Sequence, residues 1–217
     1  AMDIMYLRKE CKKWYDCILY AVFIIFLDRT ANSRTAEAII AMLIVIHLLS
    51  IIMQRNWFHK MMVLFTSGAF LLCVGIPFVG TYLYIRNPEI FQKHYGTFFS
   101  RINLTAWFYS RNERLAFYGL PLEDADCLDM LFAYIPLHWG IAAFIIITIA
   151  MIYGIYKSAK EKNTYFLILL FFCFIYGCAE TAHIYPVYSY FSLLLGYYIM
   201  NRKPFSLHIK GKTGLPA

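Results

Sequence analysis

The stretch MMVLFTSGAFLLCVGIPFVGTYLYI, from Met61 to Ile85, contains no charged residue and decides the fold class. An apolar run of this length can cross the hydrocarbon core of a membrane as one helix. The chain then becomes polar between Arg86 and Asp129. Since backbone groups of such a segment would stay unsatisfied in lipid, it must lie outside the hydrocarbon. We therefore predict a membrane protein with one large extramembrane loop over residues 86–130.

The composition favours the same class. The 217 residues are 61% hydrophobic and only 15% charged, and the mean hydropathy of +0.57 lies outside the range of soluble globular domains. The net charge of +7 does not indicate nucleic-acid binding, because the charges cluster at the ends of apolar segments. The six cysteines are scattered without a Cys-x-x-Cys pair, so neither a zinc site nor a disulfide framework is indicated.

Six apolar segments are candidate membrane spans. The expected fold class is therefore all-α, a polytopic helical membrane protein with a single domain over residues 1–217. The fifth and sixth segments form either a tight hairpin or one helix broken near Pro186. The six segments cover about residues 14–27, 36–53, 61–85, 131–156, 165–179 and 184–200.

The distribution of basic residues orients these segments. Thirteen of the 20 lysines and arginines fall before the first segment, between the second and third, between the fourth and fifth, and after the sixth. These four places share one side of the membrane if six spans alternate, and the excess of basic residues marks the cytoplasmic side. We expect cytoplasmic termini and an external loop.

Arginines near the external side are candidate ligands for an anion such as a phosphate. Arg34 immediately precedes the second segment, where it either snorkels to the headgroups or presents its guanidinium fork to a phosphate. Arg101 lies at the start of an expected amphipathic helix that extends to about Tyr118, and the helix dipole there also favours an anion. Arg111 and Arg114, on the same helix, are expected to contact solvent, lipid phosphates or an acceptor.

Two carboxylates are candidate catalytic groups. Asp129 stands at the external start of the fourth segment, where it either caps a helix or accepts a hydrogen bond from a sugar hydroxyl, as an orienting group or general base. Glu180 ends the fifth segment, and an acid this close to hydrocarbon is costly unless it is paired or lines a water-filled site. His183 and His138 flank the same face, where a lone histidine more often has a structural role; His183 is also a candidate acceptor or lipid contact.

The order of these residues resembles the O-antigen and capsular polysaccharide polymerases, the Wzy group, which share a superfamily with the O-antigen ligases. The similarity covers about residues 27–195, placed as in the C-terminal half of a family member, and the absence of a ligase-type histidine favours a polymerase. The similar motifs are Asn32-Ser33-Arg34-Thr35-Ala36, Ser100-Arg101, Phe117-Tyr118-Gly119, Asp129-Met130-Leu131-Phe132, Trp139-Gly140-Ile141 and Tyr176-Gly177-x-x-Glu180.

This resemblance implies a metal-independent, inverting glycosyltransferase without a cofactor, with a GT-C-like helical bundle in the bacterial cytoplasmic membrane and its active face outside. It implies an undecaprenyl-diphosphate-linked glycan as donor and a lipid-linked repeat unit as acceptor. Membrane lipids, a chain-length regulator and a flippase are further expected partners. In this mapping Arg34 and Arg101 hold the diphosphate, Asp129 orients or activates the acceptor hydroxyl, and Glu180 holds the arginines or a sugar.

Three alternatives remain open at the level of sequence. A ligase of the same superfamily would pass a finished glycan to a different acceptor. A membrane acyltransferase would centre on a histidine within a span, for which His47 is the candidate. A transporter or partner subunit without enzymatic activity would place functional ionisable residues near the middle of the bilayer.

Overall fold

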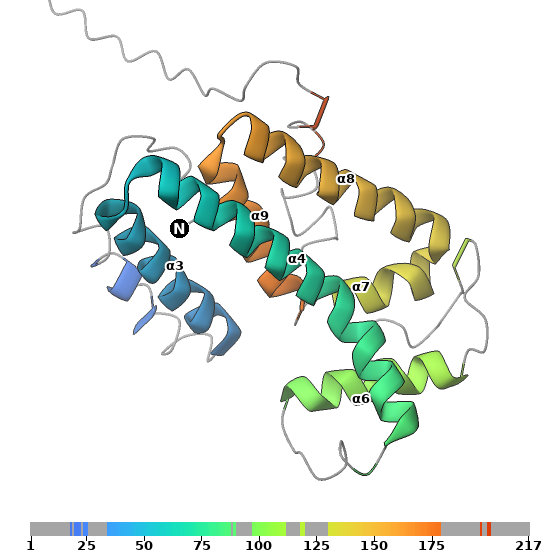
Figure 1. Ribbon diagram of the computed structural model, residues 1–217. Coiled ribbons are helices and arrows are strands. Elements are labelled where there is room, and N and C mark those ends of the chain that lie inside the picture. The colour runs from blue at the N-terminus through green and yellow to red at the C-terminus, as the bar shows by residue number, and fades with distance from the viewer. Residues whose placement is uncertain are drawn as a thin grey trace, which may run out of the picture.

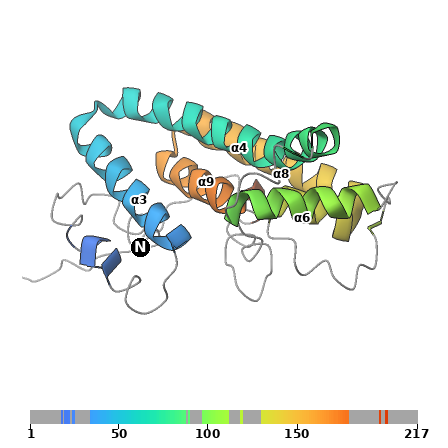
Figure 2. The ribbon, with the colours of Figure 1, turned by 90° about the horizontal axis from the view of Figure 1, so that it is seen from below.

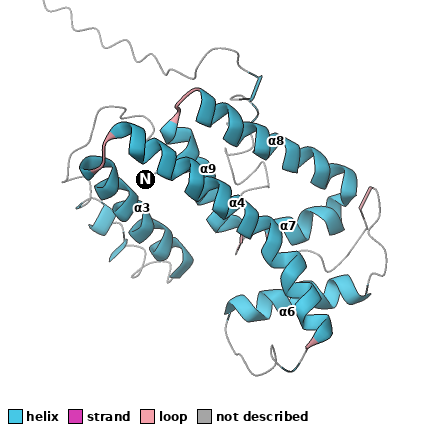
Figure 3. Ribbon diagram, viewed as in Figure 1, coloured by secondary structure: helices cyan, strands magenta, loops and turns pink. Residues whose placement is uncertain are grey.

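The computed structural model describes residues 18, 20–22, 24–25, 34–87, 89, 97–111, 118–119, 130–178, 196 and 199–200. Within these ranges every regular element is a helix (Figure 3), as the apolar segments predict. The elements are α3 (Arg34–Ile52), α4 (Arg55–Arg86), α6 (Thr97–Arg111), α7 (Leu131–Tyr134), the π-helical turn η2 (Ile135–Trp139), α8 (Gly140–Lys160) and α9 (Thr164–Gly177).

Two helical runs, Arg55–Arg86 and Leu131–Lys160, are long and apolar enough to cross a membrane. Shorter apolar helices cover Glu37–Ile52 and Thr164–Gly177. The second, third and fifth predicted segments are thus helices, although α4 begins before Met61. The first and sixth predicted segments lie mostly outside the described residues.

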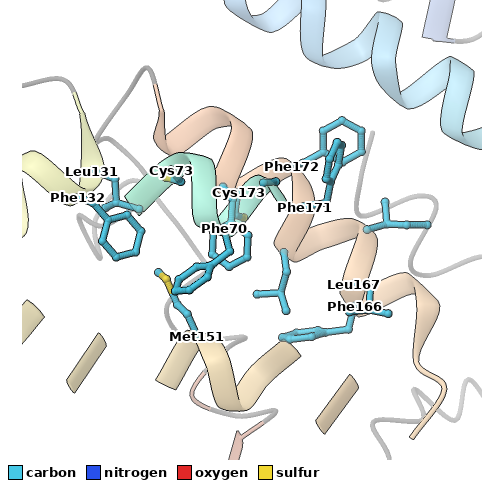
Figure 4. Close-up of a cluster of buried hydrophobic side chains, with 14 of the residues drawn as sticks. Phe70, Cys73, Leu131, Phe132, Met151, Phe166, Leu167, Phe171, Phe172 and Cys173 are labelled. Atoms are coloured by element: carbon cyan, nitrogen blue, oxygen red, sulfur yellow. The ribbon is translucent and has the colours of Figure 1, made fainter. Parts of the chain in front are cut away.

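Helix α4 is the long central element, and α9 runs parallel to it (Figure 1). Contacts advance in step along both helices: the hydroxyl of Thr66 donates to the carbonyl of Leu167 at 3.0 Å. Further along, the ring centroids of Phe70 and Phe174 lie 5.2 Å apart. Burial of these aromatic and aliphatic side chains between the two helices forms the core (Figure 4).

Helix α8 runs antiparallel to α4. At one end of the pair the Nε2 atom of His59 lies 3.2 Å from the carbonyl oxygen of Ala159. At the other end the rings of Phe78 and Phe144 are 5.8 Å apart. The short turn between α8 and α9 is closed by Asn163, whose side chain accepts a hydrogen bond from the backbone of Phe166 and caps α9.

The chain reverses direction between α7 and α8, so the fourth predicted segment, 131–156, is not one straight helix. The rings of Phe132 and Phe144 lie 5.9 Å apart, whereas twelve residues of straight helix would separate them by about 18 Å. The reversal occurs at Gly140, which has φ 89, a backbone region that favours glycine. Figure 1 shows α7 folded back beneath α8. Helix α8 alone retains 21 residues, about 31 Å of helix, which matches the hydrocarbon thickness.

Helix α6 lies across the Arg86 end of α4 (Figures 1 and 2), which confirms a helix within the predicted loop. The described helix ends at Arg111 and Tyr118 lies in a turn, while residues 112–117 lie outside the described residues, so the extension to about Tyr118 stays a prediction. Because α6 packs on α4 rather than lying free on a surface, its position is fixed by protein contacts.

Candidate functional site

The candidate site lies where α6, the Arg86 end of α4 and the start of α7 meet; we call it the α4–α6–α7 junction. Ile102 of α6 packs with Met130 and Ala133 in a small buried cluster. The hydroxyl of Thr105, on the same face of α6, lies 3.8 Å from the sulfur of Met130. Residues three and four apart on a helix share one face, so this face of α6 is buried while Trp107 is 44% exposed.

Arg101 is half-buried on α6. The described helix begins at Thr97, one residue before the predicted opening at Phe98, and four helical residues precede Arg101. The backbone N–H groups without helical partners belong to the first four residues. Arg101 therefore contributes its own charge and fork geometry, and the helix terminus is a separate feature.

The other predicted site residues are placed only in part. Arg34 begins α3 and Arg111 ends α6, but their side chains lie outside what the structure describes. In Figures 1 and 2 the start of α3 points toward the start of α6, so both helices that carry the predicted diphosphate ligands begin on the same side of the molecule. Arg114, Asp129, Glu180 and His183 lie outside the described residues.

Three polar atoms are buried around the α4–α6–α7 junction without a hydrogen-bond partner: Oγ1 of Thr81, Oδ1 of Asn103 and the phenol oxygen of Tyr109. The Tyr109 ring meets Phe78 of α4 edge to face at 6.0 Å. Burial raises the pKa of Tyr109 above that of an exposed tyrosine. An unpaired buried polar group costs about 1–3 kcal/mol, so the junction is not packed for stability alone.

A second feature, which we call the His138 turn, comprises Tyr134 to Gly140 with Gly119 packed against it. The imidazole of His138 stacks on the ring of Tyr134 with centroids 4.7 Å apart. Gly119 has φ +87, and a Cβ atom there would collide with the carbonyl oxygen of His138. Only glycine fits this contact. The fold thus brings Gly119 against His138 and Trp139, a proximity that the sequence did not predict.

His138 was interpreted from the sequence as structural, and its surroundings add information. Its Nδ1 atom is buried without a hydrogen-bond partner. The residue as a whole is half-buried, so with Nδ1 buried we infer that Nε2 is the nitrogen available to a ligand. A sequence signal existed in the spacing of Pro136, His138 and Gly140, but it does not by itself distinguish a π turn from a helix end.

Two further predictions concern groups within the helices. His47, the candidate for an acyltransferase histidine, is buried on α3 and meets the ring of Tyr20 edge to face at 6.1 Å. This contact agrees with a packing role. In the part of the chain that the structure describes, no three His, Cys, Asp or Glu side chains are grouped so that they could hold a metal ion.

Comparisons of the chain with protein-family models, with curated proteins and with solved structures found no match.

Proposed function

We propose that this chain is a bacterial surface-polysaccharide polymerase, or the C-terminal part of one. It transfers an undecaprenyl-diphosphate-linked glycan to a lipid-linked repeat unit with inversion at the anomeric carbon. The oxygen of the acceptor hydroxyl forms a new bond to the anomeric carbon. At the same time the bond between the anomeric carbon and the diphosphate oxygen breaks. The diphosphate leaves with the electron pair, and the hydroxyl proton passes to a base.

In this proposal Arg34 and Arg101 bind the diphosphate and stabilise the charge that develops as it leaves. Guanidinium forks bind such oxygens in pairs, and their effect is largest where water is excluded. Asp129 orients or activates the acceptor hydroxyl, and Glu180 holds an arginine or a sugar. The reaction then needs no metal ion.

The observation that carries the proposal is the position of Arg101. It is half-buried on a helix that rests directly on the polar end of the apolar helix α4. Such an arrangement suits a ligand whose charged group lies at the membrane surface and whose hydrocarbon tail lies in the lipid.

Exposed apolar side chains support a membrane location. Leu64 and Leu71 on α4 are 70% and 68% exposed, and Ile146 on α8 is 67% exposed. A soluble monomer rarely leaves such extended apolar faces in water. With lipid covering these faces, the positive-inside rule assigns the Arg86 end of α4 and helix α6 to the external side, with six spans and both termini in the cytoplasm.

The test is a glycan ladder on a gel from a polymerase-deficient host that expresses the full chain. We expect a ladder with the wild-type chain and none with Arg101→Ala at equal protein level. Arg101→Lys keeps the charge without the fork, and we expect a weak ladder from it. Arg86→Ala is the matched control, because Arg86 is an exposed arginine at the same end of α4 that stacks on Tyr82 at 5.0 Å.

Each result has a distinct meaning. A ladder that survives Arg101→Ala would show that the diphosphate site is wrong while the polymerase assignment stands. A wild-type chain that makes no ladder contradicts a complete polymerase, and coexpression with any coding sequence upstream tests for an incomplete one. Attachment of finished glycan to a different acceptor, without a ladder, would identify a ligase.

A further inference from the structure

The His138 turn is built with more constraint than a simple helix connection needs. Two of its glycines have a backbone in the left-handed region: Gly119, with φ 87, packs against the turn, and Gly140, with φ 89, ends it. The first lets the loop approach the carbonyl of His138 closely, and the second reverses the chain into α8. Constraint of this kind holds a side chain in one place.

The segment that carries the turn is also the most buried in the described chain. Residues Met130, Leu131, Phe132, Ala133, Ile135 and Leu137 are all 0% exposed, and Tyr134 is 2% exposed. His138 and Trp139 are the first residues of this segment that are half-buried. The imidazole therefore lies at the edge of a rigid apolar base, with its ring fixed by the stack on Tyr134.

We propose that His138 is a binding residue for a sugar hydroxyl of the lipid-linked glycan, through its Nε2 atom. This inference rests on the proposed glycan transfer. The stacked ring presents one reachable nitrogen, and a neutral imidazole nitrogen forms a hydrogen bond with a hydroxyl as either donor or acceptor. The neighbouring Trp139, whose ring lies 6.1 Å from that of Tyr134, adds an aromatic surface that is apolar and can cover the face of a sugar ring.

The contact assigned to His138 is a binding contact, and no proton transfer is assigned to it. Helix α7, which leads directly into the His138 turn, contacts α6, because Ala133 of α7 and Ile102 of α6 share one buried cluster. A glycan held at His138 therefore has a defined position relative to Arg101 on α6. The His138 turn fixes one sugar while the arginines hold the diphosphate.

The first test needs no catalytic activity. Diethyl pyrocarbonate modifies neutral histidines, and peptide mass spectrometry follows the modification of His138 in the purified full chain. We expect the lipid-linked repeat unit to slow the modification of His138 in proportion to the fraction of the protein that has bound it. His59 is the internal control, because its ring nitrogens already lie 2.9 Å from Thr164 Oγ1 and 3.2 Å from the Ala159 carbonyl.

The second test uses substitutions that imitate one ring nitrogen each. The amide of His138→Gln reaches about as far as Nε2, and that of His138→Asn reaches about as far as Nδ1. We expect the KM of His138→Gln for the lipid-linked glycan to equal that of the wild type. We expect His138→Asn and His138→Ala to raise this KM about two- to tenfold, which corresponds to the loss of one hydrogen bond. Lys60→Ala, an exposed change at the opposite end of α4, serves as the distant control.

The outcomes separate this inference from the proposed function. A wild-type ladder without protection of His138 would overturn the binding role and leave the polymerase intact. Protection without any ladder would support the glycan site and contradict a self-sufficient polymerase. Neither protection nor a ladder overturns both, and equal KM values for the Gln and Asn variants would reject Nε2 as the contact.

Discussion

The Cγ2 methyl of Ile102 lies 2.8 Å from the position that a Cβ atom on Gly80 would occupy, so α6 rests on the bare backbone of α4. A glycine inside a helix costs about 1 kcal/mol relative to alanine. At Gly80 this cost permits the close approach of a second helix. Gly75, on the same helix, has no neighbouring atom within 4 Å of its Cβ position.

The two glycines give a matched pair of substitutions. Gly80→Leu must displace Ile102, and we expect it to lower the free energy of unfolding by about 1–3 kcal/mol, as overpacking does. Gly75→Leu places its Cβ atom where no neighbouring atom lies within 4 Å, and it is expected to cost less than Gly80→Leu. Chemical denaturation in one detergent measures both, and limited proteolysis after Arg101 reports whether α6 has left α4. Equal stability of the two variants contradicts the docking of α6 on Gly80.

Gly119 gives a second prediction, for the His138 turn. Gly119→Ala puts a Cβ atom against the His138 carbonyl and forces an alanine to φ +87. The left-handed backbone alone costs roughly 1–2 kcal/mol, and the clash adds to it. We expect a lower unfolding temperature and a raised KM for the glycan, as for His138→Ala. Gly196→Ala, where no atom lies within 4 Å of the Cβ position, is the control, and a loss of equal size there would refute the clash.

The sequence predicts the helical class and most helix positions because long apolar segments are recognised from hydropathy alone. The predicted segments 61–85 and about 165–179 correspond to parts of α4 (Arg55–Arg86) and to α9 (Thr164–Gly177). The boundary at Arg55 is missed, because the first turns of α4 carry polar residues that hydropathy assigns to a loop. The hydrogen bonds of a helix join backbone N–H and C=O groups, so polar residues can also belong to its first turns.

The reversal at Gly140 could not be predicted from the sequence in the same way. Residues 131–156 contain no Asp, Glu, Lys or Arg, and hydropathy does not distinguish a straight helix from one folded back on itself. The deciding contacts, Phe132 with Phe144 and Gly119 with His138, are tertiary. For the candidate site, Arg101 lies on the predicted helix, and the roles of Arg101, Asp129 and Glu180 stay predictions.

Thr66 and Thr148 give a third prediction, on buried hydroxyls. Thr66 donates to the Leu167 carbonyl at 3.0 Å between α4 and α9, whereas the Oγ1 of Thr148 on α8 is buried without a partner. We expect Thr66→Val to lower the free energy of unfolding by roughly 0.5–1.5 kcal/mol. Thr148→Val removes only an unpaired group and is expected to be neutral or stabilising. Denaturation midpoints of both variants in one detergent decide the matter, and the reverse order would contradict the assigned hydrogen bond.

Tyr109 gives the last prediction, on pH dependence. Burial raises the pKa of its phenol above the ordinary value of about 10. Above that pH the unfolded chain has lost the phenol proton while the native protein retains it, so the native state binds more protons. The contribution of Tyr109 to stability is therefore complete below about pH 10 and is lost as the pH rises toward the higher native pKa.

Substitution of Tyr109 by Phe removes this ionisation and the phenol oxygen that has no partner. Near neutral pH we expect the variant to be as stable as the wild type or more stable. Above about pH 10 the wild type should lose up to about 1.4 kcal/mol more per pH unit than Tyr109→Phe. Tyr118→Phe, at a tyrosine that is 85% exposed, controls for ionisation of the other phenols. If wild type and Tyr109→Phe lose stability with the same slope, the Tyr109 phenol is reached by solvent and α6 does not seal it against α4.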